Sequence, residues 1–126
     1  MRVVHEPVPD AAGPGSDERD SEVLATTVEV ADSLLSRARG LMFRRSIPDD
    51  YALAFPFESA ETRDLHMLFV RFPIDAVWVV DDVVQRVERL RPWRSVARAE
   101  ADLILELPAG RGAAIDPGDR LRLEDA

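Results

Sequence analysis

Cysteine is missing from this 126-residue chain. Its absence excludes disulfide bonds, thiolate metal ligands and a cysteine nucleophile, and it agrees with a reducing cytoplasm. Long apolar runs are missing too: the longest clear one covers residues 76–80, far short of the roughly 20 residues that span a bilayer. Residues 1–16 hold no apolar segment of a secretory signal. We therefore expect a cytoplasmic protein without a membrane partner.

Lysine is also absent, and all 16 basic residues are arginines. The 24 acidic residues outnumber them and give a formal net charge of −8 at pH 7. A GC-rich genome would account for the arginines but not for the excess of acid. Molar salt shortens the Debye length to about 3 Å, so an acidic surface repels itself little there. The composition therefore predicts a halophilic protein, and it argues against nucleic acid as a partner because the usual basic footprint is missing.

The first part of the chain is rich in proline, glycine and aspartate and has no apolar period. Such a composition cannot bury enough apolar surface to fold, so residues 1–22 are predicted to be a disordered acidic tail with His5 in solvent. The remaining residues, 23–126, have about the length of one folded domain. We expect a single β-rich domain there.

Alternation of apolar and polar residues predicts most of this domain as strands. The expected strands are 24–30, 51–57, 62–70, 75–80, 83–90, 103–107 and 120–123, with 91–100 as a surface loop. Residues 83–90 also fit a helix, but their β-branched side chains and the two-residue link Asp81-Asp82 favour a hairpin. One amphipathic helix is predicted after an Asp32 cap, with an apolar face of Leu34, Leu35, Ala38, Leu41 and Met42.

The predicted fold class is mainly β (α+β by element count). Six or seven short strands would form a small closed or partly open barrel or sandwich, because closure hides the edges of a sheet. The amphipathic helix would lie near the N-terminus of the domain.

Four motifs follow one another in a recognisable order. They are Ala38-Arg39-Gly40-Leu41-Met42-Phe43-Arg44, Phe55-Pro56-Phe57, His66-Met67 ahead of Pro73-Ile74-Asp75, and Leu105-Glu106-Leu107-Pro108-Ala109-Gly110 followed by Gly118-Asp119. Together they resemble the Domain of Unknown Function 192 family over residues 24–123. The resemblance implies a compact, mainly β fold with an early helix and implies no reaction. With the acidic, lysine-free composition, it leads us to expect a haloarchaeal-type member.

One motif departs from the family pattern. Many bacterial members of the family have Trp-Met-Lys-Asn-Thr where this chain has His66-Met67-Leu68-Phe69-Val70. His66 therefore stands at the position of the aromatic residue. A role that needs the lysine or the asparagine is not expected in this chain.

Arginines gather where the predicted helix ends. Arg37, Arg39, Arg44 and Arg45 fall within a short stretch beside Gly40. Planar guanidinium groups suit the binding of carboxylate or phosphate. The alternative is that they pair with acidic residues on the surface, as charge runs usually do. Arg39 and Arg44 are our candidate ligand-binding residues from this cluster.

His66 and Asp75 form a second candidate group. A histidine oriented by a carboxylate can act as a general base, as in a hydrolase or lyase. Alternatively, His66 is a structural hydrogen-bonding residue and Asp75 accepts from backbone N–H groups at a turn. No serine stands in a nucleophile elbow and no phosphate-binding loop occurs. The catalytic residues are therefore unknown.

Glu106 and Trp93 complete the candidate set. Glu106 lies between two leucines on a predicted strand, so it is either a solvated carboxylate or a partner of an arginine in the wall of a pocket. Trp93 lies in a surface loop and is a candidate for lining a groove. Because the chain has only two histidines and no cysteine, we expect no metal site, and we expect no cofactor.

Our leading hypothesis is a non-catalytic module that binds a small anionic or polar ligand. A pocket with a few convergent polar groups is the usual form of such a site, and here its lining would be Arg39, Arg44, His66, Asp75, Trp93 and Glu106. One alternative is a hydrolase or lyase that uses His66 and Asp75. The other is a protein-interaction module that binds a protein partner through an exposed apolar patch or a sheet edge.

Overall fold

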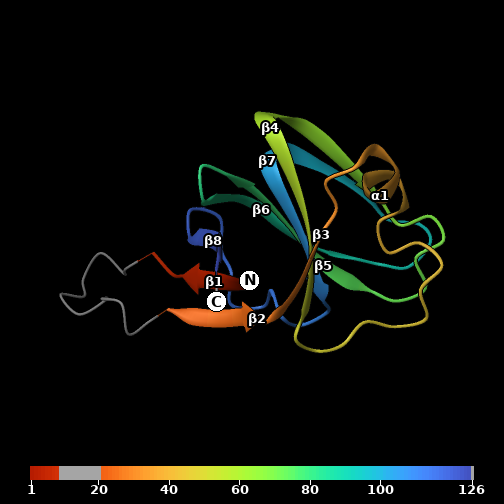
Figure 1. Cartoon of the computed structure of the whole chain (residues 1–126), viewed down its shortest axis with the longest axis horizontal. Coiled ribbons are helices and arrows are strands. Elements are labelled where there is room, and N and C mark those ends of the chain that lie inside the picture. The colour runs from red at the N-terminus through yellow and green to blue at the C-terminus, as the bar shows by residue number, and fades with distance from the viewer. Residues whose placement is uncertain (9–20, 126) are drawn as a thin grey trace.

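The computed structural model describes residues 1–8 and 21–125, which form eight strands and one short helix (Figure 1). The elements are β1 Arg2–Glu6, β2 Glu22–Ala25, β3 Thr27–Val30, α1 Leu34–Arg39, β4 Tyr51–His66, β5 Ile74–Val80, β6 Val83–Leu90, β7 Val96–Pro108 and β8 Arg120–Glu124. All strands belong to one sheet with the order β2-β1-β8-β6-β5-β7-β4-β3. The mainly β class is confirmed, with more strands than predicted.

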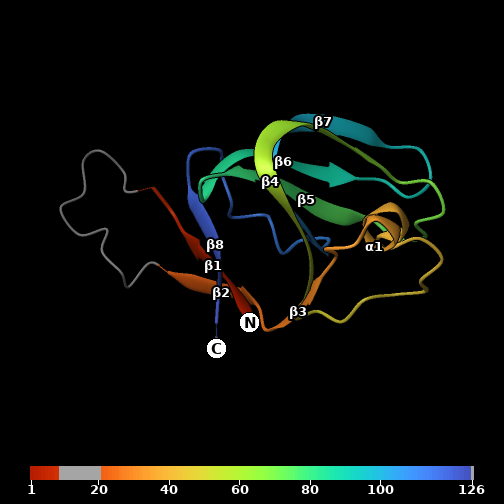
Figure 2. The same cartoon turned by 45° about the horizontal axis from the view of Figure 1, so that its top comes forward.

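The sheet curls round but hydrogen bonding does not close it into a barrel (Figure 2). Its two edge strands, β2 and β3, follow each other in the chain with only Thr26 between them. The carbonyl oxygen of Asp50 accepts hydrogen bonds from the N–H groups of Thr26 and Thr27 at 2.9 and 3.0 Å. The predicted strand 24–30 is therefore split at Thr26, where the chain passes from one edge of the sheet to the other.

Strand β1 lies inside the segment that was predicted to be a tail. It pairs with β2 on one side and with β8 on the other. His5 is only 1% exposed, and its Nε2 lies 2.8 Å from Oδ2 of Asp119. The prediction that His5 is solvated is therefore wrong, because β1 carries it into the core. Residues 9–20 of the predicted tail lie outside the described residues.

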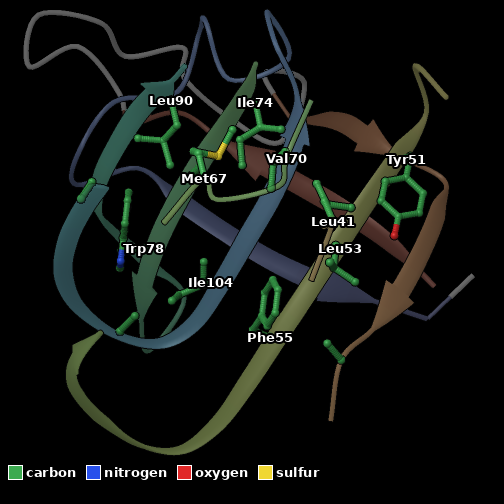
Figure 3. Close-up of a cluster of buried hydrophobic side chains, with 14 residues drawn as sticks. Leu41, Tyr51, Leu53, Phe55, Met67, Val70, Ile74, Trp78, Leu90 and Ile104 are labelled. Carbon is green, nitrogen blue, oxygen red and sulfur yellow. The ribbon is translucent and has the colours of Figure 1, made fainter. Parts of the chain in front are cut away.

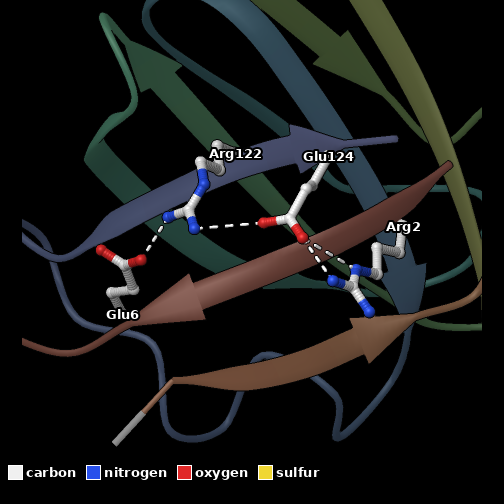
Figure 4. A network of polar contacts seen from close by, with 4 residues as sticks. All are labelled: Arg2, Glu6, Arg122 and Glu124. Carbon is white, nitrogen blue, oxygen red and sulfur yellow. Dashed lines mark hydrogen bonds and ion pairs between the residues drawn. The ribbon is translucent and has the colours of Figure 1, made fainter. Parts of the chain in front are cut away.

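Charged side chains link β1 to β8 on their outer face (Figure 4). Arg2 donates to Glu124 through Nε at 3.1 Å, and its Nη2 contacts the same carboxylate oxygen. Arg122 bonds both Glu6 and Glu124. Arginines thus hold acidic neighbours together across the two strands, as their forked geometry allows.

The helix is shorter than the predicted one. Ser33, not Asp32, is its N-cap, and Gly40 ends it with φ of +48°, a conformation that glycine adopts without steric cost. The long amphipathic helix is therefore not formed; Leu41 follows α1 but is fully buried. The side chains of Leu34, Leu35 and Ala38 lie outside the description. None of the described residues forms a helix with the length and apolarity that crossing a membrane requires.

The predicted hairpin at Asp81-Asp82 is confirmed. Both aspartates have positive φ, 48° and 65°, as a two-residue turn of type I′ requires, and they join β5 to β6. By contrast, the two strands predicted at 51–57 and 62–70 are one strand, β4, which continues through Pro56 with a register shift before Glu61. Likewise, β7 begins at Val96, inside the predicted loop 91–100.

Strand β5, the first part of β4 and the last part of β7 are buried on both faces. One face carries a core that includes Leu41, Phe55, Trp78 and Ile104 (Figure 3). The other face packs against β1, β2 and β8 through a second core that includes Leu105 and Leu121. The site described below lies on β7, which contributes residues to both cores.

If β1 is an integral strand, a charge placed in it should destabilise the fold. Val3 is 0% exposed, whereas Val23 on the neighbouring β2 is 44% exposed. We expect Val3→Asp to lower the free energy of unfolding by at least about 3 kcal/mol, because it buries an unpaired carboxylate. Val23→Asp, the matched control, should cost no more than about 0.5 kcal/mol. Urea unfolding measures both, and equal stabilities would place β1 outside the folded unit.

Candidate functional site

The carboxyl group of Glu106 is at the centre of the candidate site. Glu106 lies on β7, where its backbone is flanked by Leu53 of β4 and Ala76 of β5. Its neighbours Leu105 and Leu107 fill the core on one face of the sheet, so Glu106 projects from the opposite face. The residue is only 4% exposed. Among residues 1–8 and 21–125, no side chain or backbone group donates a hydrogen bond to its carboxyl oxygens.

A cavity of about 120 Å³ lies over this carboxyl group, and we call it the Glu106 pocket. Besides Glu106, its lining comprises Arg37, Arg39, Gly40, Leu41, Met42, Phe55, Asp64, Leu65, His66 and Val70. Gly40 brings the backbone at the end of α1 next to the acid, since a Cβ placed on it would lie 3.6 Å from Oε1 of Glu106. The pocket is thus lined by apolar and polar side chains in similar measure.

Burial raises the pKa of Glu106 to about 8, and the positive charge of Arg44 only partly opposes this rise. An apolar environment disfavours the charged form of a carboxyl group. At neutral pH most molecules therefore carry Glu106 as a neutral acid. In that form it can donate a hydrogen bond to a ligand as well as accept one.

A second cavity of about 380 Å³ lies beside α1 and shares Arg39 and Gly40 with the Glu106 pocket. Arg44 lines this second cavity, where its Nη2 donates to Oε2 of Glu29 at 2.9 Å and its Nη1 to the hydroxyl of Tyr51 at 3.0 Å. The Tyr51 hydroxyl and Arg44 together lower the pKa of Glu29. Arg44 is therefore already paired with an acid and lies next to the Glu106 pocket rather than in it.

His66 and Asp75 do not form the predicted dyad. Asp75 is buried and accepts hydrogen bonds from the N–H groups of Gly110 and Gly112, at 2.9 and 2.8 Å, and from Arg89. His66 is exposed, and its Nδ1 accepts the N–H of Leu68 at 3.2 Å. They pair with opposite ends of β7, Asp75 opposite Leu107 and His66 opposite Val96. Asp75 therefore fixes a turn, and it does not line the Glu106 pocket.

Trp93 also lies outside the predicted pocket. Its ring contacts that of Phe69 in an edge-to-face arrangement with 5.6 Å between centroids, and it is among the exposed large apolar residues. Of the six candidate residues, the structure brings Arg39, His66 and Glu106 into one pocket. Arg44 lines the adjoining cavity, and Asp75 and Trp93 line neither.

Asp64 is a pocket residue that the sequence-based candidate set left out. It stands two positions before His66 on β4, so the alternation of a strand puts both side chains on one face. The two-residue spacing between Asp64 and His66 could therefore have identified Asp64 from the sequence. Within the described part of the chain, no three His, Asp or Glu side chains come together in a way that could hold a metal ion.

Sequence comparison shows a relationship over nearly the whole chain. Residues 16–123 match the profile of the Domain of Unknown Function 192 family, described as uncharacterized ACR. A UPF0127 protein of Pyrococcus horikoshii is 36% identical over 101 residues, which are 75% of this chain and 85% of that protein. A UPF0127 protein of Thermococcus sibiricus is 36% identical over 87 residues, which are 66% of this chain and 55% of that protein.

Two crystal structures share the fold. One is of a Sinorhizobium meliloti protein, described provisionally as a transcription regulator, with a TM-score of 0.76 and 26% identity over 96% of this chain and 92% of that chain. The other is of a Novosphingobium aromaticivorans protein of unknown function, with a TM-score of 0.78 and 21% identity over 98% of this chain and 84% of that chain.

The raised pKa of Glu106 predicts a pH dependence of stability. Its pKa in the folded chain, about 8, lies above the value of 4.5 for a free carboxyl group. The folded chain thus keeps a proton that the unfolded chain releases, so the free energy of unfolding should fall as pH rises through this window. Because one pKa unit corresponds to about 1.4 kcal/mol, the total fall should be on the order of 5 kcal/mol.

The Glu106→Gln side chain keeps the shape of Glu106 but does not titrate, so its free energy of unfolding should not show this fall with pH. Above pH 8 the variant should therefore be more stable than the wild type. Glu100→Gln, an exposed change on the same strand, is the control and should follow the wild-type curve. Urea unfolding across the pH range measures all three. Parallel curves for the wild type and Glu106→Gln would contradict the assignment.

Proposed function

This chain belongs to the Domain of Unknown Function 192 family, and we propose that it is a non-catalytic module that binds a small polar ligand with an anionic group in the Glu106 pocket. The observation that carries the proposal is a buried carboxyl group that lines a cavity without a hydrogen-bonding partner among the described residues. The carboxyl oxygens of Glu106 are not fully enclosed, since His5 Nδ1 is the one fully buried side-chain polar atom without a partner among the described residues. They therefore open onto the pocket, and a ligand there would give Glu106 the hydrogen-bonding partner that buried polar groups usually have.

The groups around the pocket suit a ligand with an anionic end. Neutral Glu106 can donate a hydrogen bond to a ligand oxygen from inside, while Arg39 at the rim supplies positive charge. A liquid water molecule occupies about 30 Å³, so the pocket of about 120 Å³ accepts a group of only a few heavy atoms. A larger ligand would extend past Arg39 and Gly40 into the adjoining cavity.

The hydrolase or lyase alternative lacks support in the geometry. A base needs its orienting carboxylate within hydrogen-bond reach, and Asp75 instead bonds to Gly110, Gly112 and Arg89. We therefore keep the binding role as the proposal. A cytoplasmic location stays a prediction from the cysteine-free sequence.

We also propose that the protein works in concentrated salt. The support is the net charge of −8 and the complete use of arginine in place of lysine. In the structure, arginines pair with acids along β1 and β8 and at Glu29, which suits weakly hydrated guanidinium groups. The two curated relatives described above come from Pyrococcus and Thermococcus, so the haloarchaeal placement rests on composition alone.

A thermal-shift screen tests the binding proposal. The probes are phosphate, mono- and dicarboxylates, nucleotides, sugars and divalent metal salts. A ligand at about 100 times its dissociation constant adds roughly 2.7 kcal/mol to the free energy of unfolding, which is readily visible. We expect a carboxylate or phosphate compound to stabilise the wild type, and Arg39→Ala and Glu106→Leu, which has no hydrogen-bonding group, to lose most of the shift.

Arg120→Ala is the matched control, because Arg120 is exposed on β8 and lines neither cavity. It should keep the full shift. Should no probe stabilise the wild type, or should the shift survive in both pocket variants, the proposed role of the pocket is wrong.

Salt dependence tests the second proposal. We expect the urea midpoint to rise between about 0.1 M and about 2 M potassium chloride, because screening weakens repulsion among the acids. The triple variant Glu58→Gln/Glu100→Gln/Asp125→Asn removes three exposed acids and should show a smaller rise. A wild-type midpoint that stays constant or falls with salt would refute salt adaptation.

A further inference from the structure

Three aromatic rings form a cluster on the surface at the helix end of the molecule. Phe43 stacks on Phe69 with 5.1 Å between ring centroids, and Phe69 meets the edge of Trp93 at 5.6 Å. The three residues are between 43% and 55% exposed, and so is Leu68, which adjoins Phe69 in the chain. We call these four residues the aromatic patch. Apolar patches of this kind on soluble proteins commonly mark interaction sites.

The backbone holds these rings outward at some conformational cost. Phe43, Phe69 and Trp93 all have positive φ, at 69°, 61° and 71°, a region that bulky residues rarely adopt. Hydrogen bonds fix the three loops to one another: Phe43 N–H donates to Phe69 O at 2.9 Å, and Trp93 N–H to Met67 O at 3.0 Å. Strain maintained by surrounding contacts is typical of functional sites.

The charge of these loops is opposite to that of the rest of the protein. Segments 41–47, 65–73 and 90–95 contain five arginines and no acidic residue, in a chain whose net charge is −8. Arg44 pairs with Glu29, but none of Arg45, Arg71, Arg91 and Arg94 forms an ion pair with another described residue. The loops that carry the aromatic patch therefore also carry arginines that form no ion pair with another described residue.

We propose that the aromatic patch and its arginines form a docking surface for an acidic peptide segment of a partner protein. The apolar side chains of such a segment would cover Leu68 and the outer faces of the rings, while its carboxylates would pair with the arginines. Complementary charge supplies specificity and a fast encounter, and buried aromatic and arginine side chains supply most of the affinity at interfaces.

Other occupants fit the surface less well. A symmetric pair of copies would bring the arginines of one chain against those of the other, which repel. An extended polyanion, such as a nucleic acid or an anionic membrane, is repelled by the whole molecule with its charge of −8, whereas a short peptide touches the basic loops alone. In addition, one face of Phe69 is already stacked on Phe43, so that face is not open to a base.

Selection from a displayed library of random peptides of about twelve residues tests the proposal and does not require the partner to be identified first. The full chain is the bait, and selected peptides are then synthesised with a fluorescent label for anisotropy titrations. We expect enrichment of sequences that combine Asp or Glu with apolar residues.

The variants separate the contributions of the rings and the charges. Phe69→Asn and Trp93→Asn remove a ring and keep a residue that tolerates positive φ, so both should fold, as thermal unfolding will verify. Each should weaken peptide binding by roughly tenfold or more. Arg91→Ser/Arg94→Ser should weaken binding at low salt and have a smaller effect in molar potassium chloride. Val23→Asn, an exposed change on β2, should have no effect.

The proposal is overturned if no peptides are enriched, if the enriched peptides lack acidic residues, or if they bind the aromatic and arginine variants as well as the wild type. A single-stranded oligonucleotide, duplex DNA and vesicles containing phosphatidylserine are titrated in parallel. Binding of one of these that depends on Trp93, with no peptide binding, would identify a nucleic acid or membrane partner and reject ours. None of these outcomes depends on the Glu106 pocket.

Discussion

The pairing of β7 with both β4 and β5 is the constraint on which the site depends. Hydrogen bonds on two sides fix the backbone at Glu106. Its chain neighbours Leu105 and Leu107 are buried in the core on one face of the sheet, so the Glu106 side chain points to the opposite face. The carboxyl group cannot turn to solvent as it would from a loop, so it stays beneath Gly40 and His66 in a small pocket. Its raised pKa follows from this position in the sheet.

Local patterns predicted the local structure well. The turn at Asp81-Asp82 and its flanking strands are encoded by residues that are neighbours in the chain, so a short window of sequence is enough to predict them. Residues of strand β1 were assigned to a disordered tail because the partner strand β8 lies at the other end of the chain, and no short window of sequence contains both. The helix was made too long because the apolar period continues through Leu41, whereas Gly40 ends the helix.

The contrast between local and long-range contacts also explains why the site was predicted only in part. Arg39, His66 and Glu106 were chosen for their chemistry and do share a pocket. Asp75 was chosen on the same grounds, but its partners are backbone groups in the turn at Gly110 and Gly112, which side-chain identities do not reveal. Nor does a Leu-Glu-Leu alternation distinguish a solvated carboxylate from a buried one. The difference lies in whether another segment covers that face.

The place of β1 in the sheet also affects the order in which the chain can fold. Arg2 and Glu124 are 122 positions apart, so a ribosome makes β1 first and its neighbour β8 last. Until β8 has emerged, β1 can pair only with β2, and a lone pair of strands is barely stable in water. Contacts between such distant residues are slow to form. The sheet is therefore completed only after β8 has been synthesised, and in the interval β1 offers an unpaired edge that a chaperone could cover.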